Sequence, residues 1–177
     1  MERIVLKFAE GDYVNPDATE NVISYIMRLE KPDLVGGVGI FPFEKEMIIR
    51  QFYAVKNYYG KTGGKQIIHA VFSLDRSVFN LQEVKELGYR ISKYFGDSRQ
   101  IVFSVHDDTR KQHIHMGINT VAFTNGEYKA FFDQWELKTY AENCMNEMEE
   151  RKWLGRGLTT ANSMKYTIPR NRFTGTL

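Results

Sequence analysis

The sequence predicts an α+β fold in which a central antiparallel or mixed sheet carries helices on one of its faces. Segments that alternate apolar and polar residues are interleaved with segments of helical periodicity. The connection at 106–112 is too short for a parallel crossover, so the strands on either side of it must be antiparallel neighbours. The chain of 177 residues, 42% of them hydrophobic, can bury one domain core.

Each expected element has a local reason in the sequence. Alternation with a period of two predicts the strands, and apolar residues at helical spacing predict the helices. Asp17 with Glu20 indicates the start of the first helix, and Pro32 lies beyond its end. In chain order we expect a strand at 1–9, helices at 17–30 and 44–58, a strand at 66–74, a helix at 81–95, strands at 100–105 and 113–123, and a helix at 133–151.

Glycine-rich and polar segments predict the connections between these elements. The segment 31–43 is rich in glycine and is expected to be a loop, and Asn125-Gly126 is a strong turn signal. The end of the chain, 154–177, is expected to be irregular and basic. We therefore expect one domain over residues 1–155, followed by a basic tail over residues 156–177.

The formal net charge of +2 hides an asymmetry along the chain. Residues 151–177 contain six basic side chains and no acidic one, whereas the first 150 residues contain 18 basic and 22 acidic side chains. An acidic body of this kind does not bind phosphate over its whole surface, but it can bind phosphate locally or hold a metal cation. We expect the basic tail to supply non-specific contacts to phosphate.

The sequence has the features of a cytoplasmic protein. No run of about 18 apolar residues is present to span a membrane, and residues 1–10 lack the apolar stretch of a signal peptide. The single cysteine, Cys144, excludes a disulfide framework and suits a reducing compartment. We therefore expect a cytoplasmic location and no membrane partner.

Three of the four histidines, His106, His113 and His115, lie within ten residues of one another. Because side chains alternate along a strand, His113 and His115 share a face with Gly117, and a hairpin brings His106 opposite them. Three neutral imidazoles with an open position are typical of a catalytic divalent-metal site, while a structural zinc site would favour cysteine ligands. Gly117 is expected to leave space above the sheet for a ligand to approach.

The sequence from His106 to Asn119, HDDTRKQHIHMGIN, resembles the third motif of the mobilisation relaxases. These are HUH-type enzymes of plasmids and integrative elements that nick single-stranded DNA. Residues 68–73 resemble the family's strand of the type H-x-x-x-S-F, with Leu74 in place of the usual phenylalanine. The resemblance covers about residues 15–155, and it is greatest to the class that has a catalytic tyrosine on an N-terminal helix.

The resemblance implies a nicking reaction that passes through a covalent bond between Tyr25 and the 5′-phosphate of DNA. Helical geometry supports Tyr25 independently, because this residue lies about 130° from the centre of the apolar stripe of its helix and can present its hydroxyl to a site. A metal ion on His106, His113 and His115 would be Mn²⁺ or Mg²⁺ in use, although three imidazoles also bind Zn²⁺ or Ni²⁺ in crystals.

Further residues are expected to serve the same site. Asp108 or His69 would accept the tyrosine proton or orient a ligand histidine. The expected partner is single-stranded DNA at a transfer origin, and an accessory mobilisation protein would help to locate that origin. The residues expected to contact DNA are Arg28, Lys61, Lys65, Asn119, Arg151 and Lys152.

Three alternatives stay open at this point. A rolling-circle replication initiator of the HUH type would have its catalytic tyrosine after the histidines, where Tyr140 lies on the helix at 133–151. A non-catalytic DNA-binding module would share the fold but leave DNA uncut. A metal-dependent hydrolase of small substrates would need a closed pocket, whereas a DNA strand needs an open groove.

Overall fold

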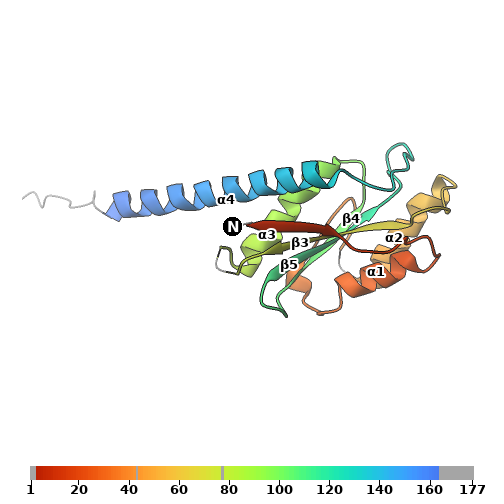
Figure 1. Ribbon diagram of the computed structural model, residues 1–177, viewed down its shortest axis with the longest axis horizontal. Coiled ribbons are helices and arrows are strands. Elements are labelled where there is room, and N and C mark those ends of the chain that lie inside the picture. Colours follow the sequence, from red (N-terminus) through yellow and green to blue (C-terminus); the bar gives the residue numbers. More distant parts are fainter. Residues whose placement is uncertain (1–2, 43, 77, 164–177) are drawn as a thin grey trace, which may run out of the picture. The chain divides into compact units, whose positions relative to one another are not determined.

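We describe the protein from a computed structural model that covers residues 3–42, 44–76 and 78–163, with the backbone alone over 155–163. The chain divides into two compact units, Met1–Cys144 and Met145–Leu177. The first unit contains a five-stranded sheet with the order β1-β3-β5-β4-β2, in which every neighbouring pair of strands is antiparallel (Figure 1). The predicted α+β class with an antiparallel sheet is therefore confirmed.

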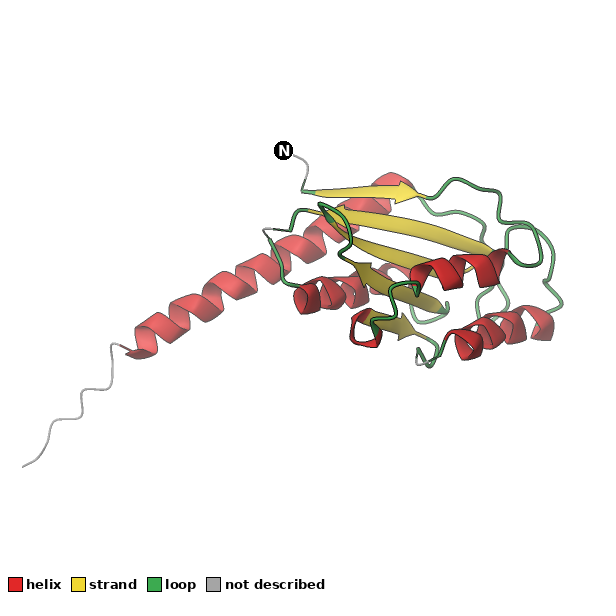
Figure 2. Ribbon diagram, turned by 90° about the horizontal axis from the view of Figure 1, so that it is seen from below, coloured by secondary structure: helices red, strands yellow, loops and turns green. Residues whose placement is uncertain are grey.

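The helices and strands follow the predicted order, with one additional strand. The strands are β1 (Ile4–Phe8), β2 (Val35–Val38), β3 (Ile67–Leu74), β4 (Ile101–His106) and β5 (Gln112–Asn119). The helices are α1 (Ala18–Ile26), α2 (Lys45–Tyr58), α3 (Leu81–Ser92) and α4 (Gln134–Ser163), and two short 3-10 turns are η1 (Pro32–Leu34) and η2 (Lys93–Phe95). Figure 2 shows the strands side by side, with helices packed along them.

Helices cover both faces of the sheet, so the expectation that they pack on one face was wrong. Val102 of β4 packs in a cluster with buried residues of α1 and α2. The next residue, Phe103, points to the opposite face because side chains alternate along a strand, and there its ring contacts Gly88 and Tyr89 of α3. We call the face that carries Val102 the α1 face, and every histidine lies on it by strand alternation.

The segment 31–43 is not only a loop, because it contains the edge strand β2. Gly36 and Gly37 pair with Phe103 and Val102 of β4. A Cβ atom on Gly36 would lie 2.3 Å from Cζ of Phe103, so the glycine makes room for that buried ring. Local sequence favours a loop here, but packing against β4 selects a strand.

Other boundaries differ from the expected ones by several residues. Helix α1 ends at Ile26 instead of near residue 30, and Glu30 has a left-handed backbone with φ of 49°. Strand β5 ends at Asn119 instead of 123. Helix α4 continues to Ser163, so the expected irregular structure after 154 was wrong up to that residue. The rest of the expected tail, 164–177, lies outside the described residues, and the domain boundary at 155 stays a prediction.

A buried lysine joins α1 and α2 to the start of β3. The Lys56 side chain is 1% exposed. Its ammonium group donates to Oγ1 of Thr19, 2.9 Å away, and to the carbonyl and side-chain oxygens of Gln66. Burial lowers the pKa of Lys56 to about 8. The three acceptors satisfy the ammonium donors without a carboxylate, and the contact with Thr19 ties α1 to α2.

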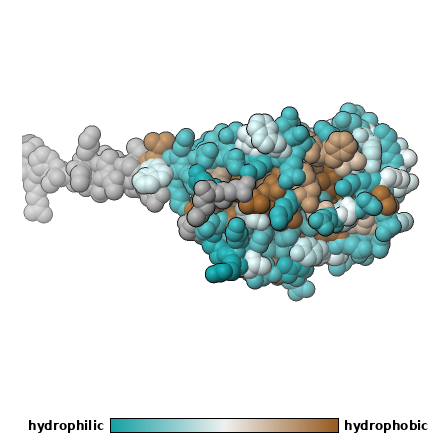
Figure 3. All heavy atoms as spheres, in the orientation of Figure 1, coloured by the Kyte–Doolittle hydropathy of each residue, from teal (hydrophilic) through white to brown (hydrophobic). Residues whose placement is uncertain are grey.

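The surface on the side shown in Figure 3 is largely hydrophilic, with smaller hydrophobic areas between the polar ones. None of the helices in the described part of the chain combines the length and the hydrophobicity that a membrane span requires. The exposed hydrophobic side chains include Phe41, Tyr58, Phe131 and Trp135.

Replacing Gly36 with alanine should lower the free energy of unfolding by about 1–3 kcal/mol, because the new methyl group meets the buried ring of Phe103. Urea unfolding followed by circular dichroism measures the change. Gly63→Ala is the matched control, since a Cβ atom there meets nothing within 4 Å, and it should leave the stability nearly unchanged. A Gly36→Ala protein as stable as the control would contradict the proposed packing at β2.

Candidate active site

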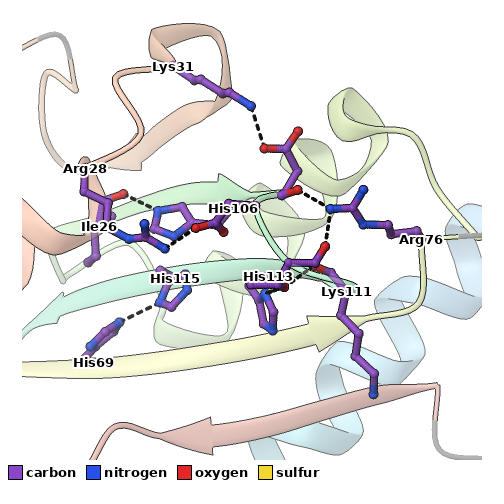
Figure 4. Close-up of polar contacts among 12 residues, drawn as sticks. Ile26, Arg28, Lys31, His69, Arg76, His106, Lys111, His113 and His115 are labelled. Atoms are coloured by element: carbon purple, nitrogen blue, oxygen red, sulfur yellow. Dashed lines mark hydrogen bonds and ion pairs between the residues drawn. The ribbon is translucent and has the colours of Figure 1, made fainter.

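Three neighbouring strands present all four histidines on the α1 face (Figure 4). In the sheet register His106 lies opposite His113, as predicted from the hairpin. The ring centroids of His106 and His115 are 4.3 Å apart, and the ring of His69 lies 5.3 Å from that of His115. The ring of His113 lies 5.9 Å from the same residue, so His115 is the centre of the cluster.

Helix α1 places Tyr25 next to this cluster. The Tyr25 side chain is 45% exposed, whereas Ile23 and Ile26 of the same helix are fully buried. Its ring centroid lies 5.2 Å from that of His115, 5.8 Å from that of His69 and 6.0 Å from that of the His106 ring. The expectation that Tyr25 lies off the apolar stripe is confirmed.

Tyr140 lies in a different environment. Its ring centroid is 5.5 Å from that of Tyr94 in η2, and the Tyr94 ring also contacts Phe95 and Phe132. Among the described residues, the tyrosine whose ring contacts histidines is Tyr25. The arrangement therefore favours a nucleophile that precedes the histidines over the rolling-circle alternative with Tyr140.

Each of the four histidines uses one ring nitrogen in a contact that fixes its orientation. His106 donates from Nε2 to the carbonyl oxygen of Ile26 over 2.7 Å, and His69 Nε2 lies 3.1 Å from His115 Nδ1. His113 Nδ1 lies 3.3 Å from the hydroxyl of Thr109. Metal-ligating histidines commonly have this pattern, because a hydrogen bond at one ring nitrogen directs the other toward the metal ion.

The other ring nitrogen of His106 is the best indication of a metal ligand. His106 Nδ1 is buried, and it has no hydrogen-bond partner among the described residues. A buried polar atom of this kind costs free energy unless a ligand satisfies it, and a metal ion bound to this nitrogen would satisfy it. Within the described part of the chain, no three His, Cys, Asp or Glu side chains already have the geometry of a metal site.

Burial keeps the histidines neutral. It lowers the pKa of His69 to about 4 and, together with the neighbouring histidines, the pKa of His115 to about 3. The pKa values of His106 and His113 are lowered as well, in both cases chiefly by burial. A neutral imidazole is the form that binds a metal ion or accepts a proton.

An ion pair stands between Tyr25 and the loop that connects β4 to β5. Arg28 donates to Oδ2 of Asp108 over 2.7 Å, and its guanidinium carbon lies 5.0 Å from the centroid of the Tyr25 ring. The hydrogen bond from Arg28 holds the pKa of the Asp108 carboxyl below its usual value. The same loop is held by Lys31, which pairs with Asp107 over 2.6 Å, and by Arg76, which donates to the loop backbone (Figure 4).

Tyr25 and His115 stand in an open groove. Two cavities, of about 520 and about 400 Å³, have both residues in their walls and also share Ala9 and Val71. The larger cavity extends past His113 toward the loop at 107–111, and the smaller one extends past His69 toward Tyr13. The two cavities share one wall and together extend from the loop at 107–111 to Tyr13, so an extended chain can lie along both of them.

The residues expected to contact DNA are scattered. Arg28 lines the groove, and the Lys65 ammonium group lies 5.7 Å from the ring centroid of Tyr13, which lines the smaller cavity. Lys61 donates to the carbonyl oxygen of Gly126 over 2.5 Å. Arg151 and Lys152 lie on α4 in the second unit, outside the unit that holds the groove.

Asn119 is corrected as a DNA contact because it is fully buried. Its amide nitrogen donates to the carbonyl oxygen of Phe52 and to Oε1 of Gln100, and its side-chain oxygen accepts from the backbone of Val121. All of its donors and its acceptor are therefore used inside the fold. Sequence reasoning could not distinguish this role from a surface role. Strand alternation shows on which face of the sheet a side chain lies, but it does not show whether other elements cover that face.

Two basic residues of the groove were not anticipated. Lys7 on β1 and Lys111 beside β5 both line the larger cavity, and both are exposed. Lys7 pairs with Val71, and strand alternation places both on the α1 face. The signal for Lys7 was thus present in the sequence, but it required the pairing of β1 with β3.

The space above Gly117 is filled, so the expectation of an approach path there was wrong. A Cβ atom on Gly117 would lie 2.9 Å from Cδ1 of Ile26 and 3.1 Å from Cδ1 of Ile67. The glycine therefore lets α1 approach the sheet closely. Ile26, the residue after Tyr25, thus sets the distance between α1 and the strands that carry the histidines.

The chain is similar to a known family of proteins. The family model described as "Relaxase: MobA/VirD2-like, nuclease domain" matches residues 25–154. The match covers more than half of the chain, begins at Tyr25 and includes all four histidines. A search of curated proteins finds no match.

Replacing Gly117 with alanine should lower the free energy of unfolding by about 1–3 kcal/mol, because the new methyl group meets Ile26, the last residue of α1. Ile26→Val removes the Cδ1 atom that lies nearest, so the double variant should recover part of the loss. Chemical unfolding of the four proteins of this cycle measures the coupling. Strictly additive effects would contradict a direct contact between the two positions.

Proposed function

The chain belongs to the relaxase family of DNA-nicking enzymes, in the MobA/VirD2-like group, and on this basis we propose that it cuts and rejoins one strand of DNA at a transfer origin. In this proposal the cut leaves the 5′-phosphate bound to Tyr25 and releases a free 3′-hydroxyl. The energy of the phosphodiester is kept in the new bond, so rejoining needs no nucleotide cofactor. The partner is single-stranded DNA, and the biological role is mobilisation of a plasmid or another mobile element.

The observation that carries the proposal is the contact of Tyr25 with three histidine rings inside an open groove. A tyrosine in a solvent-facing helix position usually packs or hydrogen-bonds at a surface. Here its ring is held among buried neutral imidazoles, and a guanidinium lies on the ring. This is the environment in which a hydroxyl can lose its proton and in which a phosphate can be bound next to it.

The reaction is a transesterification in which the atoms balance without an added co-reactant. The hydroxyl oxygen of Tyr25 attacks the phosphorus and the bond from phosphorus to the 3′-oxygen breaks. The tyrosine proton passes to a base of the protein, and the departing 3′-oxygen takes up a proton. The reverse reaction uses the same groups, because the 3′-hydroxyl then attacks the phosphotyrosine.

Asp108 and His69 are assigned different parts in this reaction. Asp108 is engaged with Arg28, so we assign it the role of holding the guanidinium against the Tyr25 ring before the strand binds. His69 is neutral and lies in ring contact with Tyr25, so we assign it as the proton acceptor. Its contact with His115 also orients that ring.

The histidines His106, His113 and His115 would hold a divalent metal ion, Mn²⁺ or Mg²⁺ in use. When bound, such an ion polarises the scissile phosphate and offsets the negative charge on its oxygens. The orphaned Nδ1 of His106 and the neutral state of all three rings support this assignment. Lys7, Lys111 and Arg28 add positive charge along the groove.

Basic residues outside the groove are proposed to contact the DNA further from the cut. The Lys65 ammonium group lies 5.7 Å from the ring centroid of Tyr13, which lines the smaller cavity. Arg151, Lys152 and the tail at 156–177 would supply non-specific contacts to phosphate, and an accessory protein would help to select the origin. Removing the residues after Leu154 should then weaken DNA binding more than it slows nicking at saturating DNA.

Tyr25→Phe should abolish the covalent adduct with DNA, because it removes the attacking oxygen. The measurement is a denaturing gel of the protein after incubation with single-stranded oligonucleotides that tile the DNA flanking its own gene. Tyr140→Phe, the matched control, should form the adduct as the unmodified protein does. An adduct that survives Tyr25→Phe and disappears with Tyr140→Phe would establish the rolling-circle alternative instead.

Mn²⁺ should raise the melting temperature of the protein by roughly 5 °C or more at saturation, because it binds the folded state. His106→Ala should lose this shift, whereas His69→Ala, which removes a histidine but no proposed ligand, should keep it at saturating metal. Nicking should stop when EDTA is added and resume with excess Mn²⁺. A full shift in His106→Ala would exclude this set of ligands.

A further inference from the structure

A third cavity lies beside the groove, on the other flank of α1. It measures about 430 Å³, and we call it the Pro32 pocket. Its apolar wall is formed by Met27, Pro32, Val35 and Pro42. The rest of its lining is polar or charged and consists of Ser24, Arg28, Glu30, Lys31, Lys45 and Glu46. The cavity therefore combines an apolar wall, which can pack on a planar ring, with several polar and charged groups that can meet the polar edge of such a ring.

The Pro32 pocket and the groove lie next to each other and share one lining side chain. Arg28 lines both cavities, and Ser24 of the pocket precedes Tyr25 of the groove in α1. Lys31 lines the pocket and reaches Asp107, next to the groove residue Asp108 (Figure 4). Arg28 therefore forms a wall that the two cavities have in common.

Two exposed ion pairs mark the passage between the cavities. They are Arg28 with Asp108 and Lys31 with Asp107, and all four side chains are partly accessible to solvent. Exposed ion pairs of this kind contribute little to stability, so a stronger anion can replace the carboxylates. A DNA phosphate is such an anion, and arginine in particular binds phosphate through two parallel hydrogen bonds.

We propose that the Pro32 pocket holds one unstacked base of the DNA strand, while a phosphate of the same strand takes Arg28 and Lys31 from Asp108 and Asp107. This inference rests on the proposed function, since it assumes that the strand lies in the groove at Tyr25. The base packs on Met27 and the prolines, and the polar groups of the pocket meet its edge. The pocket thereby sets the register of the strand at the cut.

The first test fills the pocket. Ser24→Trp should weaken binding of a fluorescent single strand of mixed sequence about tenfold, because the indole occupies the place of the base. The same variant should bind a strand of equal length with an abasic backbone as the parent does. All proteins carry Tyr25→Phe so that binding is measured without cutting. Gln82→Trp, at an exposed position of α3 that lines none of the three cavities described here, should change neither affinity.

The second test addresses the exchange of ion pairs. Asp107→Asn frees Lys31 and should tighten binding of both strands about threefold, and this gain should vanish when Lys31→Gln is added. Asp97→Asn is the control, because it removes the same charge at an exposed turn. It should tighten DNA binding less than Asp107→Asn does, and adding Lys31→Gln should not change that smaller gain. Melting temperatures of all variants confirm that they are folded.

The outcomes separate this inference from the proposed function. If Ser24→Trp weakens both strands equally, or neither, the base subsite is wrong even when the parent protein nicks DNA. If Asp107→Asn acts independently of Lys31, the exchange of partners is wrong. If the binding differences appear but no oligonucleotide forms an adduct with Tyr25, the proposed reaction fails while the subsite stands.

Discussion

The site depends on the close approach of α1 to the sheet at Gly117. The absent side chain lets Ile26 pack onto β5, and the carbonyl group of the same residue accepts a hydrogen bond from His106. Successive residues of a helix differ by about 100° around its axis, so burying Ile26 turns Tyr25 outward into the groove. One contact thus fixes the depth of the helix, the orientation of a histidine ring and the position of the tyrosine.

Electrostatics in the groove are local, and this reconciles an acidic body with a DNA substrate. Burial, which is partial at His113, lowers the pKa of all four imidazoles and keeps them neutral, so they neither repel a metal ion nor add charge of their own. Fixed positive charge comes from Arg28 and from the lysines along the groove. The carboxylates of Asp108 and Asp107 hold Arg28 and the neighbouring Lys31 in place when no phosphate is present.

Much of this arrangement could be predicted from short-range patterns. Strand alternation put His113 and His115 on one face, and the short hairpin put His106 opposite them. The helical period put Tyr25 off the apolar stripe. These features depend on neighbours along the chain, and tertiary packing did not override them. The strand at β2 was missed because its conformation depends on Phe103, a residue far away in the sequence.

The sequence by itself determined which residues share a face and which family the motif resembles, because both follow from spacing along the chain. Only the tertiary structure decided what covers each face. It buried Asn119 inside the fold, filled the space above Gly117 and joined His69 to His115. It also paired Arg28 with Asp108 across 80 positions of sequence. Such contacts depend on how elements pack, and a single sequence carries no local signal of that packing.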